Sequence, residues 1–276
     1  MTGGSFLTFE VIVERGYIFA AEEPAACIQY VTHTMLLVDL IIMALAMAIT
    51  NKVAAGLPGD AWNVIMVHWG PKGRLASAWG ESIAGGWGAN AFSDGESAVI
   101  HTGAGDFRNF PVEVMENKYP VRINLYGLGM DSGGPGRQRG GLNIVKEYET
   151  LLDKVDLSLW FERTLTPSWG LFGGQDGSVP QVLVNVGSGN EEQLQKVDSL
   201  PLGKGTRFRV STGGGGGYGP AWEREPHLVQ EDVRDDYVSR AMAQEAYGVV
   251  LKGGCLAIDE KETHKLRALR RDSDTG

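Results

Sequence analysis

Two glycine-dense segments constrain the fold of this chain more than any other feature of its sequence. The first is Asp131–Leu142, DSGGPGRQRGGL, which carries two arginines, and the second is Thr212–Pro220, TGGGGGYGP. Glycine reaches positive φ angles at little cost, and because it has no Cβ another backbone or a ligand can approach it closely. The two segments therefore predict either chain crossings or a binding surface that larger side chains would obstruct.

The composition is that of a globular protein with many turns. The chain has 276 residues, of which 43% are hydrophobic and 21% charged, enough to bury a sizeable core. With this hydrophobic content, 39 glycines indicate a β-rich fold with many turns and not a disordered chain. The net charge is -9, and nucleic-acid binding usually requires an excess of basic residues, so we expect no nucleic-acid partner.

The cysteines and the N-terminal region bear on the cellular compartment. Cys27 and Cys255 belong to no CxxC or Cys/His cluster, so neither a disulfide framework nor a zinc site is predicted. Acidic Glu10 and Glu14 stand where a signal peptide would have basic residues. The longest apolar run, Met35–Ile49, is shorter than the roughly 20 residues of a membrane span. We therefore expect a cytoplasmic protein with no membrane segment.

Alternating apolar and polar residues predict many short strands, consistent with stacked antiparallel sheets or a barrel-like body. An N-terminal strand is expected at Ser5–Val13. The further predicted strands are Trp62–Val67, Trp79–Ile83, Val121–Gly127, Leu142–Leu151, Leu157–Glu162, Pro180–Val186 and Thr206–Ser211.

Helices are expected near both ends of the chain. The apolar run predicts one buried N-terminal helix that reaches about Lys52. Pro226–Arg234 has proline in its first turn, and Ser239 can cap a second short helix. The fold class we predict is α+β, with a β-rich body of mostly antiparallel strands, that buried helix and short C-terminal helices. Residues 1–252 are expected to form one unit, and 253–276 a charged, partly disordered tail.

Three generic catalytic motifs are absent from the sequence. Gly203–Thr206 lacks the spacing and leading glycine of a phosphate-binding loop, and Gly80–Ala84 fails the last position of GxSxG. The five histidines form no HxxxH or HExxH pair, so no compact metal site is predicted from local sequence.

The middle third of the chain holds the best candidate for catalysis. Asp94, His101 and Glu113 place two carboxylates and an imidazole between predicted strands. An imidazole near neutral pKa beside a carboxylate can carry a proton, which makes His101 and Asp94 a candidate polar pair, with Glu113 supporting them. The alternative is structural: Asp94 lies in a turn, and His101 satisfies a backbone group.

The glycine-dense segments carry candidates for anion binding. Arg137 and Arg139 could clamp a carboxylate or phosphate in a bidentate manner, or pair with Asp131 or with acids of a partner subunit. The amides of the five consecutive glycines before Tyr218 could contact an anion. Because no lysine or helix start follows them, a tight structural crossing is the alternative.

An ordered series of short segments resembles the hydantoinase B family, which includes subunits of ATP-dependent hydantoinases, 5-oxoprolinases and acetone and acetophenone carboxylases. The resemblance runs from about Gly3 to Leu251. Its matching pieces are Gly4–Phe6, Glu10-Val11, the helix after Val31-Thr32, Ala84–Ala89, Asp94-Gly95, Asn109–Glu113, Tyr119-Pro120, Asp131–Leu142, Trp169–Gly174, Gly214–Gly219, Asp232-Val233, Val238-Ser239 and Tyr247–Val249.

The resemblance implies a partnership between subunits. A hydantoinase A-like subunit uses ATP and Mg to activate the substrate carbonyl as a phosphorylated intermediate, and the B-like part completes ring opening or carboxylation of the small-molecule substrate. The chain looks like the C-terminal half of a B-like protein, so the N-terminal half is an expected partner, with the divalent metal of the family in that half. An exposed apolar patch is expected where that half would pack.

The chain departs from the family pattern in two places. Gly103–Arg108 replaces an asparagine-threonine run, and Gly219-Pro220 stands where aspartate-proline is common. Three functions remain open: part of a cyclic amide hydrolase, a subunit of an acetone- or acetophenone-type carboxylase, and a non-catalytic scaffold or truncated remnant.

Overall fold

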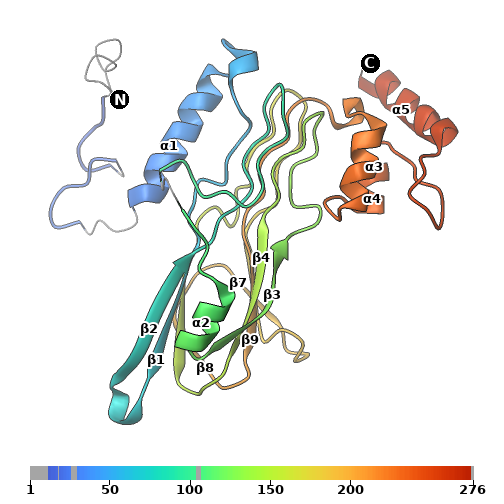
Figure 1. Cartoon of the computed structure of the whole chain (residues 1–276). Coiled ribbons are helices and arrows are strands. Elements are labelled where there is room, and N and C mark those ends of the chain that lie inside the picture. The colour runs from blue at the N-terminus through green and yellow to red at the C-terminus, as the bar shows by residue number, and fades with distance from the viewer. Residues whose placement is uncertain (1–11, 18, 26–29, 104–106, 275–276) are drawn as a thin grey trace.

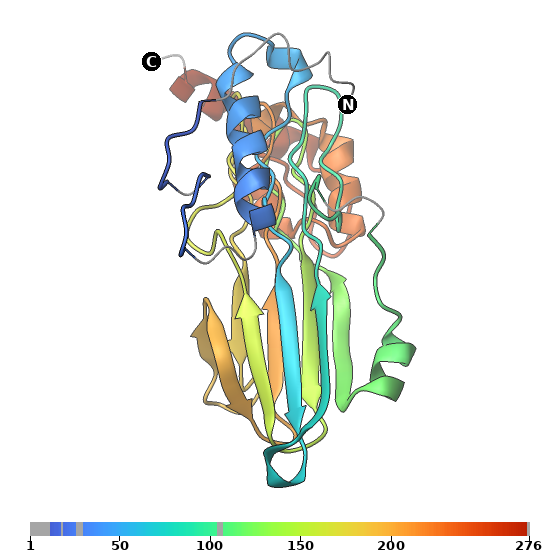
Figure 2. The same ribbon diagram turned by 90° about the vertical axis from the view of Figure 1, so that its left-hand side faces the viewer.

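Two antiparallel sheets form one end of the molecule, and glycine-rich loops extend from them toward flanking helices (Figures 1 and 2). The computed structural model describes residues 12–17, 19–25, 30–103 and 107–274. Most of the strand predicted at Ser5–Val13, and Cys27, lie outside the described residues. The α+β class with two stacked antiparallel sheets is confirmed.

The first sheet has four strands in the order β2-β1-β5-β8. Its strands are β1 (Asn63–Trp69), β2 (Leu75–Ser82), β5 (Val155–Trp160) and β8 (Val197–Leu202). β1 pairs with β2 and with β5 in antiparallel register, with Met66 opposite both Trp79 and Leu157. β8 was not predicted, because its sequence VDSLPL alternates poorly and includes a proline.

The second sheet has five strands in the order β3-β4-β9-β6-β7. Its strands are β3 (Val121–Leu128), β4 (Ile144–Thr150), β6 (Gln181–Val184), β7 (Glu192–Leu194) and β9 (Arg207–Ser211). Apart from the polar three-residue β7, each lies where a strand is predicted. All neighbouring strands of this sheet pair in antiparallel fashion, with Tyr148 opposite Phe208 at the centre.

The core lies between the two sheets. Val64 and Leu157 from the first sheet and Tyr148, Phe208 and Val210 from the second belong to one buried cluster. The rings of Tyr148 and Phe208 stack at 4.8 Å between centroids. Burial of apolar surface at about 25 cal/mol per Å2 makes this cluster the main source of stability for the β body.

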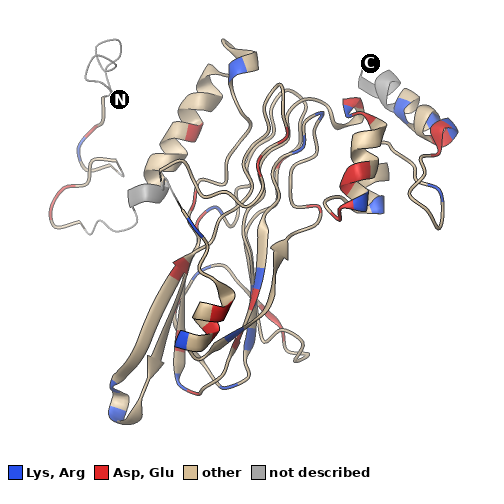
Figure 3. Cartoon of the chain, in the orientation of Figure 1, with Lys and Arg blue, Asp and Glu red and all other residues tan. Residues whose placement is uncertain are grey.

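Helix α1 (Tyr30–Leu45) forms as predicted, but the prediction that it is buried is wrong. Leu40 and Ile41 are 45% and 52% exposed, and Asp39 is the buried residue among its described side chains. Its sequence is mostly apolar, and the carboxylate of Asp39 links it to the body by accepting a hydrogen bond from the Leu57 amide. Figure 3 shows one acidic position along the helix, and the exposed side chains of Val38, Leu40, Ile41, Met43 and Leu45 form an apolar surface on it.

The described residues form four further α-helices, and their bounds are α2 (Val112–Lys118), α3 (Pro226–Arg234), α4 (Arg240–Glu245) and α5 (Glu260–Asp274). α3 has the predicted bounds, and Ser239 caps α4 by accepting a hydrogen bond from the Met242 amide. These C-terminal helices share a second small core around Val229 and Tyr247. α5 lies in the segment expected to be a tail, and its Arg267 donates hydrogen bonds to backbone oxygens of Tyr247 and Arg224.

Glycine-rich segments lie side by side in layers beyond the sheets (Figure 1). We call them the glycine array, and it comprises residues 55–59, 84–90, 94–99, 132–142, 168–178 and 212–220. The amides of Gly214, Gly215, Gly216 and Gly217 all donate to backbone oxygens of neighbouring segments. A Cβ on Gly215 would overlap the backbone carbonyl of Trp87. The five-glycine segment is therefore a tight crossing in which four of the five amides are occupied, and those four are not available to an anion.

Candidate functional site

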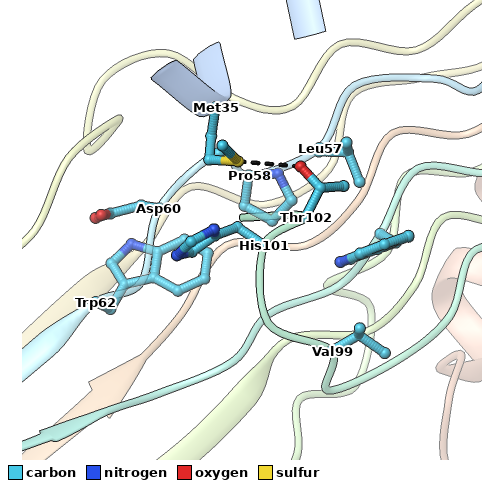
Figure 4. Close-up of a pocket in the computed structure, with 10 residues that line it drawn as sticks. Met35, Leu57, Pro58, Asp60, Trp62, Val99, His101 and Thr102 are labelled. Carbon is cyan, nitrogen blue, oxygen red and sulfur yellow. Dashed lines mark hydrogen bonds between the residues drawn. The ribbon is translucent and has the colours of Figure 1, made fainter. Parts of the chain in front are cut away.

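A small cavity beside α1 contains His101, the central residue of the predicted site. We call it the His101 cavity; it is lined by Met35, Leu57, Pro58, Gly59, Asp60, Trp62, Trp87, Val99, His101 and Thr102 (Figure 4). These residues come from α1, from the segment that enters β1, from the glycine array, and from the segment after residue 99 that carries His101 and Thr102. The fold thus gathers there residues that are distant in sequence.

The protonation state of His101 follows from its surroundings. The side chain is 8% exposed, and burial lowers its pKa below the usual 6.5, so the imidazole is neutral at pH 7. Its Nδ1 accepts a hydrogen bond from the Gly103 amide at 3.1 Å, which assigns the proton to Nε2. His101 does satisfy a backbone group, as the structural alternative expected, and it also keeps an N–H donor on its other nitrogen.

Trp62 lines the same cavity and carries a buried indole N–H group. Its six-membered ring packs against the glycine array, where a Cβ on Gly85 or Gly213 would lie 2.5 or 3.1 Å from its carbons. Its Nε1 is buried and has no hydrogen-bond partner among the described residues. An unmade buried N–H bond costs about 1–3 kcal/mol. The cavity leaves about 10 Å3, close to the roughly 10–15 Å3 that one water-sized group needs.

The walls of the cavity are held by Asp60 and by α1. Asp60 accepts hydrogen bonds from the amides of Ala61 at 2.8 Å and Glu162 at 2.7 Å, which joins the start of β1 to the end of β5. Thr102 Oγ1 donates to the sulfur of Met35 at 3.0 Å, and this contact brings α1 over the cavity (Figure 4). The cavity is thus covered by a helix that has few polar contacts with the body.

The main polar anchor of α1 is Asp39. Its carboxylate accepts a hydrogen bond from the Leu57 amide at 3.1 Å and lies 3.5 Å from the Arg163 guanidinium. Burial raises the pKa of Asp39 to about 7, although Arg163 opposes the shift. Arg163 also donates to the backbone oxygens of Leu57 and Pro167. This anchor is therefore sensitive to pH near neutrality.

Asp94 belongs to a different cluster, the Asp94 network, which consists of Asp94, Arg139, Arg224 and Asp232. Arg224 binds Asp94 in a bidentate manner, with both N–O distances 2.7 Å, and also contacts Asp232 at 2.9 Å. Arg139 lies 3.3 Å from Asp232. Burial raises the pKa of Asp232, against the opposing effect of the two arginines. The network ties the glycine array to α3.

The other predicted site residues lie apart from the His101 cavity. Arg139 is 5% exposed, and its partners are internal carboxylates and the ring of Tyr237, 5.3 Å away. Arg137 has a 43% exposed side chain and pairs with Glu223 at 3.6 Å. Glu113 is exposed in the first turn of α2. Neither Asp94 nor Glu113 lines the cavity.

Trp62, Arg224 and Asp232 are the important residues that sequence reasoning did not assign to a site. The sequence predicts Trp62 only as the start of a strand, and no local motif links it to His101. Asp232 is part of the family resemblance, but its pairing with Arg224 depends on how α3 packs against the glycine array.

Comparison with known proteins decides the family. The model of the family described as hydantoinase B/oxoprolinase matches residues 1–221. This chain belongs to the hydantoinase B/oxoprolinase family. It is 28% identical over 96% of its length to the B component of a putative D-/L-hydantoinase from a Pseudomonas species, covering 44% of that protein. It is 30% identical over 92% of its length to the beta component of the caprolactamase from Pseudomonas jessenii, covering 45% of it.

Solved structures agree with this assignment. The chain is similar to the crystal structure of the ATP-dependent caprolactamase from Pseudomonas jessenii, with a TM-score of 0.72, 27% identity, and coverage of 90% of this chain and 44% of that one. It shares the fold of nucleotide-free acetone carboxylase at a TM-score of 0.65 and 20% identity, covering 81% of this chain and 34% of that one. The chain of this family member thus spans about half the length of the curated relatives named above.

Two further findings concern the described part of the chain. No helix there is both long and apolar enough to span a membrane. The same residues contain no group of three or more His, Cys, Asp or Glu side chains arranged to hold a metal ion.

Proposed function

We propose that this chain is part of a B-type subunit that opens cyclic amides together with an A-type, ATP-using subunit. The observation that carries the proposal is the family match over residues 1–221, joined to the similarity with the B component of a hydantoinase and the beta component of a caprolactamase. Both relatives are named as one subunit of a larger enzyme, which supports a partner of the A type.

The chemistry of an amide explains why two subunits would cooperate. A ring amide is stable toward water, and phosphorylation of its carbonyl oxygen creates a good leaving group. ATP and Mg would act in the A-type partner. We propose that the divalent metal expected for the family lies in the remaining part of the B-type subunit; among the described residues, no group of three or more His, Cys, Asp or Glu side chains is arranged to hold one.

The contribution we propose for this chain is the pair of N–H donors in the His101 cavity. Neutral His101 offers Nε2–H, and Trp62 offers the buried Nε1–H that has no partner among the described residues. Fixed donors in a site that excludes water stabilise negative charge that develops on an oxygen atom. The space suits one oxygen, either of a water molecule or of a substrate carbonyl. His101 would act here as a donor, since its other nitrogen is occupied.

Isolation of the complex tests the proposal. The chain is tagged in its native host, purified with its partners, and assayed for ATP-dependent ring opening of hydantoin, 5-oxoproline and caprolactam. We expect an A-type ATP-using subunit in the eluate and ATP hydrolysis that depends on a cyclic amide. Carboxylation of acetone or acetophenone in the presence of bicarbonate would instead make the chain a carboxylase subunit. Recovery of the chain alone, without either activity, would support the scaffold alternative.

A further inference from the structure

A second, larger cavity lies away from the His101 cavity, between β2 and α2. It has a volume of about 70 Å3 and is lined by Trp79, Gly80, Glu81, Phe110, Met115 and Tyr119. Phe110 and Tyr119 belong to the Asn109–Glu113 and Tyr119-Pro120 segments of the family resemblance, which the proposed function does not use. Helix α2 lies beside β3 and next to the edge strand β2, so the cavity opens at the side of the β body (Figure 1).

Aromatic rings form the apolar walls of this cavity. The rings of Trp79 and Tyr119 lie 5.6 Å apart, tilted by 31°, and Phe110 is 41% exposed. Met115 is 1% exposed and closes the inner wall. The faces of aromatic rings attract organic cations, and an aromatic cage is a common binding site for alkylated ammonium groups.

Glu81 supplies one polar group to the wall. Its Oε1 accepts hydrogen bonds from Lys146 at 2.8 Å and from the Tyr148 hydroxyl, and its Oε2 accepts from Lys146 at 2.9 Å. A carboxylate has about four acceptor positions, two on each oxygen. Among the described residues, three are therefore filled, and one position on Oε2 remains for an N–H donor.

The neighbours of Glu81 fix its carboxylate in place. Lys146 is buried, with its Nζ 4.7 Å from the ring centroid of Tyr126 and 5.2 Å from that of Tyr148. This ion pair joins the two sheets, since Glu81 is on β2 and Lys146 on β4. Because Lys146 balances the charge of Glu81, the attraction for a ligand cation comes from the aromatic rings. The free acceptor position on Oε2 orients an N–H group of the ligand.

We propose that this cavity binds a small alkylated ammonium group that keeps one N–H. The N–H donates to Oε2 of Glu81, and the alkyl groups contact Trp79 and Tyr119. The volume admits the head group alone, so the rest of a larger ligand extends past Phe110 into solvent. The site is independent of the proposed ring-opening reaction, and no bond is made or broken in it.

Methyl NMR of the full chain tests the proposal with defined probes. The eight methionines are labelled with carbon-13 at the methyl group, and the Met115 signal is assigned through the Met115→Leu variant. Trimethylammonium, which has one N–H, is compared with tetramethylammonium, which has none, and with tert-butanol, a neutral molecule of similar shape. Met35 and Met43, both on α1 and outside this cavity, serve as internal controls.

We expect trimethylammonium to shift the Met115 signal in a saturable manner, with the control methyls unchanged and with weaker binding of the other two probes. Tyr119→Leu should weaken the binding about fivefold by removing one aromatic wall, whereas Phe92→Leu, at a 77% exposed aromatic, should leave it unchanged. Equal binding of tert-butanol, or no shift of Met115 in the folded wild-type chain, would overturn the cation site. Equal binding of tetramethylammonium would overturn the role of Glu81.

Discussion

The Asp94 network and the His101 cavity use residues that are neighbours in sequence, yet they differ in how their polar groups are satisfied. In the Asp94 network, Asp94 and Asp232 are both bound by arginines. In the His101 cavity, Trp62 Nε1 has no partner among the described residues, and His101 keeps a donor nitrogen. Carboxylates that are all paired with arginines are typical of a cluster that stabilises the fold, whereas N–H donors without partners around a small cavity are typical of a binding site.

The largest expected effect is the loss of stability when the Asp94 network is broken. Arg224→Met removes the bidentate bonds to Asp94 and the contact with Asp232, and it leaves a buried carboxylate with one arginine fewer. We expect the free energy of unfolding to fall by about 3–5 kcal/mol, measured by urea titration of the intact chain.

Arg137→Met is the matched control for that variant. Arg137 is partly exposed and pairs with Glu223 at 3.6 Å, so we expect a loss of less than about 1 kcal/mol. Equal losses of unfolding free energy in Arg224→Met and Arg137→Met would show that the buried ion pairs of the Asp94 network stabilise the fold no more than an exposed pair does.

A substitution in the glycine array should affect both the Asp94 network and the His101 cavity. Gly215→Ala places a Cβ against the carbonyl of Trp87, a residue that lines the His101 cavity, while the Gly215 amide bonds to Gly141 near Arg139. We expect a loss of about 3 kcal/mol from overpacking, again by urea titration. Gly127→Ala is the control, since no atom lies within 4 Å of its added Cβ, and it should change stability by less than about 1 kcal/mol. Tolerance of Gly215→Ala would contradict the layered packing.

The pH dependence of stability tests the anchoring of α1, the helix that covers the His101 cavity, through Asp39. Burial raises the pKa of Asp39 from 3.8 to about 7, so the folded state favours the protonated carboxyl. Its contribution to stability is therefore fully present below about pH 4 and is lost as the pH rises through 7. We expect Asp39→Asn to flatten the stability profile between about pH 4 and 7, measured by thermal unfolding. An unchanged slope would mean that Asp39 does not titrate in this range.

Trp62→Phe should have the smallest effect on stability. The change removes a buried N–H that has no partner among the described residues, and it also removes the outer indole carbons that pack against Gly85 and Gly213. We expect the free energy of unfolding to fall by about 1–2 kcal/mol, because removal of the unpaired donor offsets only part of the lost packing. A loss near that of Arg224→Met would place Trp62 among the structural residues.

Much of the fold could be predicted because strand formation depends on local alternation. The strands around Val64, Tyr148 and Val210 are visible in the sequence since their inward residues are apolar. The burial of α1 could not be predicted, because an apolar helix looks the same in sequence whether or not another surface covers it. The polar β7 and proline-containing β8 lack the alternating pattern and are held by pairing with neighbouring strands.

The candidate site was only partly predictable. His101 was predicted as a catalytic candidate together with Asp94, because only six residues separate them, and in the structure His101 lines a cavity whereas Asp94 does not. The packing of the glycine array places His101 and Asp94 in different clusters. It places Trp62 near His101 and Arg224 beside Asp94, although both are distant in sequence. Which glycine-rich segments cross is a tertiary property that no local spacing encodes.

The donor nitrogen of His101 is the group on which the proposed reaction depends most directly. The measurement is kcat for ATP-dependent ring opening by the purified complex, with His101→Phe compared with His101→Gln, which keeps an N–H donor, and with unfolding temperatures recorded for both. We predict that His101→Phe lowers kcat about a hundredfold, that His101→Gln restores part of it, and that both complexes stay folded. Unchanged kcat in a folded His101→Phe complex would contradict the assignment of the His101 cavity to catalysis.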